Sequence, residues 1–428
     1  NFFIDIFLGF IVISFIVTIF HFFFKINLVI SSLIFLSGFV RYFKKKDINF
    51  SFEFIKKNIF YIIIVFLLIP MFVSQKYHED FGYYHLPYAL SFIEEKIVFG
   101  FANIDKPFVY NSIWLNLYSI FFSNGKNFDF LTLPSFILFL SFIIFAIRNI
   151  IEKKDQIKNS DYYLIVILFY FLLKFTRISE FGVDFPAIIF SVLSIYYFIK
   201  FYETKENLDK RSFFYFNLVF AIFAILIKLS TVLIIILPIF LFLTNFKDLK
   251  FYILSLRFFS ISFLCIIFFV QQFIYTGCFL FPTTLTCLNV SWFNPEHIDL
   301  SKRLELINKS YSSAKGIYSP EEYLSNFNWF LIWIKRNFKE ILEHLMTMIL
   351  PILIFVLVLK KKLGPILVFE KKLILVFFII LSLIFFFIYS PVLRFAIHIY
   401  ITLIFLFFSK ILISKEFSKK KFIIFISV

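Results

Sequence analysis

Charged side chains are scarce in this sequence of 428 residues, of which Asp, Glu, Lys and Arg together make up only 16%. Soluble domains carry about 25% charged residues and roughly 45–50% apolar residues. Hydrophobic residues here reach 61%, and a soluble chain of this kind would expose apolar patches larger than a monomer tolerates. The composition therefore excludes a soluble globular protein and indicates one that crosses a membrane repeatedly.

Cysteine is also scarce, with three in the chain. Cys265 falls within an apolar run and is expected to be a small core residue. Cys278 and Cys287 flank the sequence FLFPTTLT in a loop that we place outside the cytoplasm, where disulfides persist. They are predicted to form a disulfide, with two free thiols as the alternative. No His or Cys pair stands beside them at metal-ligand spacing, which argues against a metal site there.

Internal repeats and low-complexity linkers are not evident, so residues 1–428 are interpreted as a single transmembrane domain. Apolar runs of suitable length predict an all-α, polytopic bundle of about 11–13 transmembrane helices. The first run is long and lacks a small-residue cleavage site, which argues against a cleavable signal peptide. The runs cover residues 3–24, 27–42, 57–74, 128–147, 161–177, 184–201, 213–228, 230–246, 252–273, 341–359, 372–389 and 393–410.

The net charge of +16 does not require a nucleic-acid partner. Most of the 43 Lys and Arg residues lie in every second short loop between the apolar runs, and cytoplasmic loops of membrane proteins collect such residues. This assignment puts the remaining loops on the outer side. They are residues from about 75 to 127, the short turn 178–184 and the long loop from about 274 to 340.

Segments within these outer loops are predicted to lie at the membrane surface. Residues 84–99 place apolar side chains on one helix face and Ser and Glu on the other, which predicts a helix in the plane of the interface. Residues 111–122 show a weaker form of the same pattern. Trp329 and Trp333 precede the next apolar run. They either anchor at the headgroups or pack so as to position the following helix, and we favour packing.

Charged groups gather where the predicted spans meet the outer side. They are Glu79 and Asp80 after the third run, Arg177, Glu180 and Asp184 in RISEFGVDFP, Lys228 in LIKLST, and Arg394 in SPVLRF. Each alone is explained by a helix cap or by a snorkelling side chain. Together they suit a reaction on a lipid phosphate, in which a carboxylate deprotonates or orients a hydroxyl and a cation neutralises the departing phosphate.

The segment DFGYYHLPYALSFIEE, residues 80–95, resembles the first outer loop of GT-C-fold integral membrane glycosyltransferases, particularly uncharacterised bacterial members. In those proteins an Asp stands four residues before a Tyr-His-Leu-Pro block. EFGVDFPA, TGCFLFPTTLTC and SPVLRF resemble later motifs of that branch, in the same order. The resemblance covers residues 57–410, and the YHLP block is its most specific element.

The resemblance implies a GT-C-like bundle in the bacterial inner (plasma) membrane, with its active site on the periplasmic side. The reaction implied moves a sugar from a polyprenyl-phosphate-linked donor to a lipid or glycan acceptor of the cell envelope. No cofactor is implied with certainty, although a divalent cation is a candidate. By motif position, Asp80 would be the general base, Asp184 a second carboxylate of the same cavity, and Arg394 the partner of the carrier phosphate. Glu79 forms with Asp80 an acidic pair similar to the one in protein mannosyltransferases and is a further candidate catalytic acid. Lys228, His85 and Tyr84 are candidate contacts to phosphate or hydroxyl groups.

Other classes of protein stay open at this point. An O-antigen polymerase or ligase belongs to the same broad reaction class, and its chemistry leans on Arg and His in outer loops. A transporter of lipid-linked oligosaccharides would place charged groups near the middle of the bilayer. The charges here collect at one boundary instead, although Lys174 and Arg257 lie somewhat inside their spans. A structural role without catalysis is a further alternative.

Overall fold

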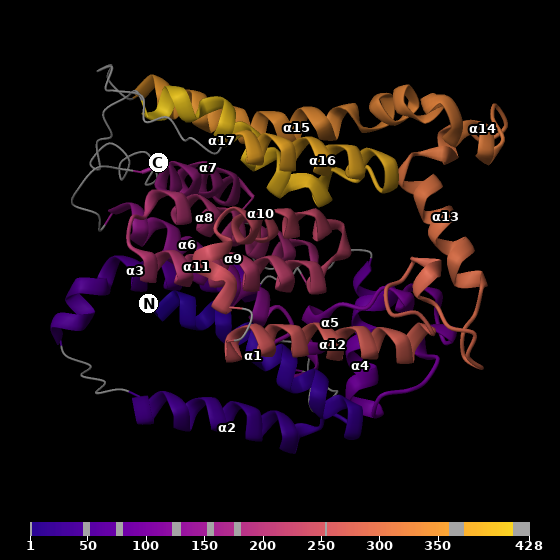
Figure 1. Ribbon diagram of the computed structural model, residues 1–428, viewed down its shortest axis with the longest axis horizontal. Coiled ribbons are helices and arrows are strands. Elements are labelled where there is room, and N and C mark those ends of the chain that lie inside the picture. Colours follow the sequence, from indigo (N-terminus) through magenta and orange to yellow (C-terminus); the bar gives the residue numbers. More distant parts are fainter. Residues whose placement is uncertain are drawn as a thin grey trace. The chain divides into compact units, whose positions relative to one another are not determined.

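The computed structural model describes residues 2–45, 52–73, 80–121, 130–151, 158–174, 181–252, 255–358 and 372–413. Within these residues the secondary structure is helical, with no strand beyond isolated bridges (Figure 1). The all-α class predicted from the sequence is therefore confirmed for the described part of the chain. The chain divides into two compact units, each assembled from separate stretches of sequence.

Unit 1 consists of residues 1–145, 175–186 and 260–295. It contains α1 (Phe2–Phe23), α2 (Leu28–Lys45), α3 (Phe52–Val73), the π-helix η1 (Phe81–His85), α4 (Leu86–Glu94), the 3-10 helices η2 (Phe101–Asn103) and η3 (Lys106–Val109), α5 (Ile113–Tyr118), the 3-10 helix η4 (Ser119–Phe121), most of α6 (Leu133–Ile151) and most of α12 (Leu256–Thr276). The first residues of α8 also belong to this unit.

Unit 2 consists of residues 146–174, 187–259 and 296–428. It contains α7 (Asn159–Leu173), most of α8 (Asp184–Glu203), α9 (Asn207–Ile227), the 3-10 helix η6 (Leu229–Ile235), α10 (Ile236–Thr244), α11 (Phe246–Leu249), α13 (Glu296–Asn308), α14 (Pro320–Leu324), α15 (Asn328–Val358), α16 (Lys372–Tyr389), the 3-10 helix η11 (Leu393–Ala396) and α17 (Ile397–Ile413).

Five of the described helices are long and apolar enough to cross a membrane, namely α1, α6, α8, α9 and α12. A sixth candidate is the pair Leu229–Thr244 and Phe246–Tyr252, which is bent by 97° at its break. Shorter apolar helices lie within α2, α3, α7, α16 and α17. Within the described residues, each apolar run predicted from the sequence falls mainly on helical segments, although run 230–246 is divided between η6 and α10. The chain is an integral membrane protein.

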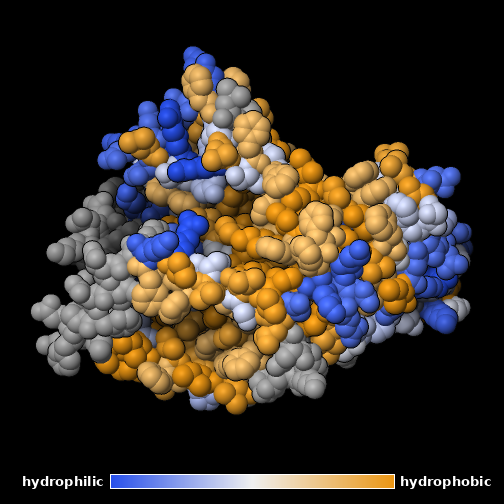
Figure 2. Space-filling view, turned by 90° about the horizontal axis from the view of Figure 1, so that it is seen from below, coloured by the Kyte–Doolittle hydropathy of each residue, from blue (hydrophilic) through white to orange (hydrophobic). Residues whose placement is uncertain are grey.

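Lipid explains why so much apolar surface is left exposed. Figure 2 shows one face on which hydrophobic side chains cover most of the described surface and hydrophilic ones gather in separate patches. Along α2, Leu36 is 57% and Phe39 60% exposed. Water would penalise such a surface, whereas the hydrocarbon layer of a bilayer does not.

The segment predicted as the first interfacial helix, residues 84–99, forms the end of η1 and all of α4, which stops at Glu94. Tyr88, Ala89 and Phe92 form its buried face, and Phe92 stacks on His21 at the end of α1 with ring centroids 3.6 Å apart. Glu94 is exposed, as predicted. The helix is therefore held to the protein by its aromatic side and is not a surface helix alone.

The second predicted interfacial segment, residues 111–122, differs from the prediction. It forms α5 and η4, and every side chain of α5 is buried. The helix packs against α1, where Trp114 contacts Phe10 at 5.2 Å between ring centroids. Burial on all sides corrects the expectation of an exposed amphipathic helix, because a neighbouring helix covers the face that was assigned to water.

In unit 2, α7 is the central helix, and its side chains from Asn159 to Phe171 are all buried. A helix without a polar face needs neighbours around it, and α15 and α17 pack against it. Trp329 and Trp333 on α15 are also buried, and both contact Phe387 of α16. The tryptophans therefore position the following helices, which was the favoured interpretation of their sequence.

Cys278 and Cys287 form the predicted disulfide, which closes a loop next to the end of α12. We expect the Cys278→Ser, Cys287→Ser double variant to lower the free energy of unfolding of this region by roughly 2.5–3 kcal/mol, because the open loop has more unfolded conformations. The check is the midpoint of thermal unfolding in detergent, with Cys265→Ser as the control. Equal midpoints for the double variant and the control would contradict a stabilising role.

Candidate functional site

The first part of the candidate site begins at Asp80, directly before the π-helix Phe81–His85. The Asp80 side chain is half-buried, and its backbone already has helical angles. Single π-helical turns are rare and occur frequently at functional sites. Here the turn joins directly to α4 and places Tyr84 against buried His85, with ring centroids 4.2 Å apart. Glu79 lies outside the described residues.

Phe181 connects this turn to the second acidic motif, which precedes α8. Its buried ring packs edge-on against Phe81 at 5.1 Å and lies 5.9 Å from His85. On another side it stacks on Tyr118 of α5, with centroids 4.0 Å apart. The segments DFGYYH and FGVDF, far apart in the sequence, therefore pack together within unit 1.

Asp184 opens α8 and is half-buried. An acid in the first helical turn is stabilised by the exposed N–H groups and the dipole of the helix, so a purely structural role accounts for its position too. The preceding backbone is held by Tyr118, whose hydroxyl donates to the carbonyl of Gly182 at 3.2 Å and shares a hydrogen bond with Ser135 at 2.6 Å. Arg177 and Glu180 of the same motif lie outside the described residues.

A buried polar network holds α4 in place, and the sequence reasoning missed it. The Tyr88 hydroxyl donates to the side-chain oxygen of Asn116 at 3.0 Å, and the Asn116 amide donates to Thr18 at 2.8 Å and to Gln271 at 3.0 Å. Burial raises the pKa of Tyr88 well above its ordinary value, and Tyr275 adds to this shift, so the hydroxyl stays a donor. The polar residues within otherwise apolar segments could have indicated such a network in the sequence.

The predicted cations lie in unit 2 and form a set of their own. Lys228 stands at the junction of α9 and η6, and its ammonium lies 3.3 Å from the centroid of the Phe395 ring. Arg394 in η11 lies 5.5 Å from the same ring. Both side chains are half-buried. Cation–π attraction stabilises each of them, and the shared ring gathers two positive charges in a small volume.

The structure thus groups the predicted residues into two sets. Asp80, Tyr84, His85 and Asp184 belong to unit 1, whereas Lys228 and Arg394 belong to unit 2. Among the described ranges, no group of three or more His, Cys, Asp or Glu side chains could hold a metal ion. A divalent cation would therefore need ligands beyond such a protein cluster, for example from a substrate phosphate.

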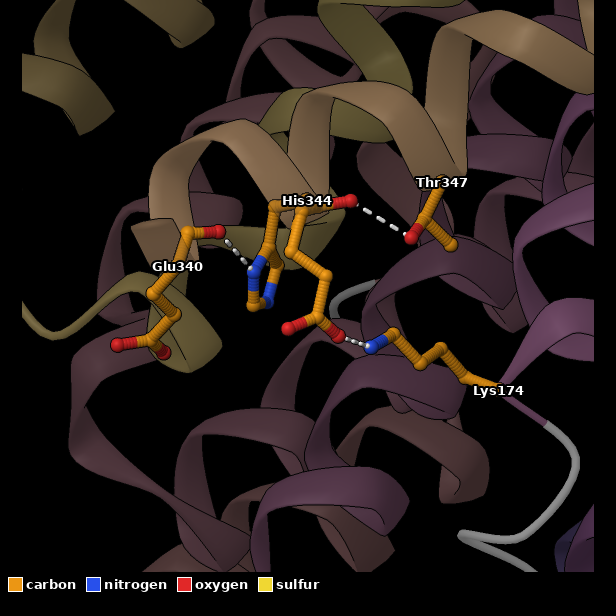
Figure 3. Close-up of polar contacts among 5 residues, drawn as sticks. Lys174, Glu340, His344 and Thr347 are labelled. Carbon is orange, nitrogen blue, oxygen red and sulfur yellow. Dashed lines mark hydrogen bonds and ion pairs between the residues drawn. The ribbon is translucent and has the colours of Figure 1, made fainter. Parts of the chain in front are cut away.

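Lys174, whose position inside a span stood out in the sequence, directly follows α7 as its C-cap residue and pairs with Glu343 of α15. Figure 3 shows the Lys174 ammonium directed at this carboxylate. His344 and Thr347 form hydrogen bonds with backbone carbonyls of the preceding turn of α15. The Lys174 side chain is 19% exposed. An ion pair here satisfies a charge that would be costly alone at a membrane boundary.

The chain belongs to a family described as a domain of unknown function (DUF8201), whose model matches residues 1–402. No curated protein and no solved structure matches it.

Proposed function

We propose that this protein is a membrane glycosyltransferase that moves a sugar from a polyprenyl-phosphate carrier to a cell-envelope acceptor on the extracytoplasmic face. The observation that carries the proposal is the packing of the two acidic motifs around Phe181, which sets Asp80 and Asp184 on adjoining segments of unit 1. The sequence resemblance to GT-C glycosyltransferases and the pairing of Lys228 with Arg394 on one ring give further support.

The chemistry assigned to these residues balances without a further reactant. The acceptor hydroxyl attacks the anomeric carbon of the donor sugar, the bond from that carbon to the phosphate oxygen breaks, and the hydroxyl proton passes to Asp80. Asp184 orients the acceptor or a cation. Arg394, with Lys228, neutralises the phosphate whose charge grows as it departs. Attack from the face opposite the leaving phosphate inverts the anomeric centre.

Confinement to the membrane explains why such residues would act at this depth. The isoprenoid tail of the donor stays in the hydrocarbon, so its phosphate and anomeric carbon are restricted to the headgroup layer. Fixed groups at the same depth then meet the reacting atoms with little further loss of translational freedom. In the sequence-based topology, Asp80, Asp184, Lys228 and Arg394 all lie at the outer boundary.

The direct test is reconstitution of the full chain in proteoliposomes with a panel of radiolabelled polyprenyl-phosphate sugars and an envelope extract as acceptor. Release of polyprenyl phosphate together with transfer of label to the acceptor supports the proposal. Movement of the intact donor across the bilayer without release of the phosphate would favour a transporter instead. Joining of repeating oligosaccharide units would favour a polymerase or ligase.

A further inference from the structure

The long helix α15 carries an exposed face that combines two lysines with a continuous apolar stripe. Lys335 and Lys339 are exposed and stand one turn apart, so they share a face of the helix. The same face continues with Leu342, Leu345, Met346, Leu350 and Leu353, which are between 42% and 56% exposed. The opposite face is buried in unit 2 through Trp333, His344 and Met348.

The sequence-based topology places the start of the apolar part of α15 at the outer boundary of the bilayer. The apolar run predicted as the span within α15 begins near residue 341. At a helical rise of about 1.5 Å per residue, Lys339 lies about 3 Å and Lys335 about 9 Å outside that start. The polar headgroup layer on each side of the hydrocarbon is about 5–7 Å thick. The lysines therefore stand in or beside this layer, and the stripe runs down into the hydrocarbon.

Local charges leave the lysines available to an anion. Two like charges at this helical spacing destabilise the helix, and a negative group between them removes the repulsion. Glu343 is one turn below Lys339, but its carboxylate pairs with Lys174 (Figure 3). On the neighbouring flank, Arg336 donates to the hydroxyls of Ser312 and Ser313, which fixes the outer loop against α15 beside the two lysines.

We propose that this face of α15 binds an anionic phospholipid of the outer leaflet. Its phosphate lies between Lys335 and Lys339, and one acyl chain follows the stripe from Leu342 to Leu353. Charge complementarity selects the negative head group, and the exposed apolar stripe directly below the two lysines selects a ligand with a hydrocarbon tail. The inference does not depend on the proposed sugar transfer, because it involves none of the residues assigned to that reaction.

The test measures lipid binding to the detergent-solubilised full chain by native mass spectrometry. Phosphatidylglycerol is the probe, and phosphatidylcholine with the same acyl chains is the comparison. We expect the wild type to prefer phosphatidylglycerol, and the Lys335→Ala, Lys339→Ala variant to bind it roughly thirtyfold more weakly, since each of the two cations near an anionic surface contributes roughly fivefold. Lys335→Arg, Lys339→Arg should retain binding.

The matched control is Lys302→Ala, Lys315→Ala, which removes two exposed positive charges from the same outer loop, away from any such stripe. If both double-alanine variants lose the same amount of phosphatidylglycerol binding, the proposal is wrong and the attraction depends only on overall positive charge. Inorganic phosphate that displaces phosphatidylglycerol at equal concentration would overturn it in favour of a free-phosphate site. A phosphatidylglycerol with a photoreactive acyl chain should label residues 342–353 of the wild type, and labelling elsewhere alone would also contradict it.

Discussion

Replacing Asp80 with Asn is expected to abolish measurable sugar transfer, with a fall of roughly 10²- to 10⁴-fold, the usual contribution of a general base. Asn keeps the size and shape of Asp but cannot take a proton from the acceptor hydroxyl. Asp80 is half-buried beside the π-helix, so the substitution should leave expression and membrane insertion unchanged. The measurement is the initial rate of transfer in proteoliposomes with equal amounts of inserted protein.

The control for this change is Glu94→Gln, which neutralises an exposed acid on α4 in the same outer loop. It should retain the rate of the wild type, because its side chain is exposed and has no part in the proposed reaction. Turnover of Asp80→Asn at the wild-type rate would remove Asp80 from the mechanism. A matching loss in Glu94→Gln would indicate that the charge of the whole loop, and not one carboxylate, governs activity.

Replacing Arg394 should weaken binding of the donor, and the size of the loss should depend on the replacement. Arg394→Ala removes the charge and the planar fork, and hydrogen bonds to charged groups contribute about 1.5–3 kcal/mol, so we expect KM for the donor to rise roughly 10- to 100-fold. Arg394→Lys retains the charge and should lose less, because only the two-point geometry disappears. Steady-state kinetics over a range of donor concentrations distinguish these cases.

Arg303→Ala provides the matched control, since it removes an exposed guanidinium from the outer loop in unit 2. Its KM should equal that of the wild type. If alanine and lysine at position 394 raise KM equally, a phosphate-binding role for this side chain is wrong. An effect on kcat alone would agree with the proposed neutralisation of the departing phosphate but would contradict the predicted role of Arg394 in donor binding.

Much of the fold could be predicted from the sequence, because hydrophobic length alone decides where a chain crosses a bilayer. The positions of the helices and the Cys278–Cys287 disulfide follow from such local signals. The burial of α5 could not be predicted, because the amphipathic pattern of residues 111–122 does not reveal that α1 covers its second face. The start of α15 at Asn328 was also missed, since its first turns are too charged to resemble a span.

The candidate site was predictable only in part. The sequence predicts both acidic motifs at one membrane boundary, and the structure packs their segments together through Phe81 and Phe181. The contacts that join them depend on Phe181. Nothing in the sequence distinguishes this residue from the other Phe residues among the 74 in the chain. The shared position of Lys228 and Arg394 on Phe395 was equally hidden, because cation–π pairs have no sequence spacing.

The aromatic packing around Phe181 has a mechanical consequence. Its ring packs against Phe81, His85 and Tyr118. Because the Phe181 ring is buried, neither acidic segment can move alone without breaking these aromatic contacts. The two segments must then move as one block. In the proposed reaction, Asp80 and Asp184 would therefore keep fixed positions while the lipid-bound donor diffuses to them.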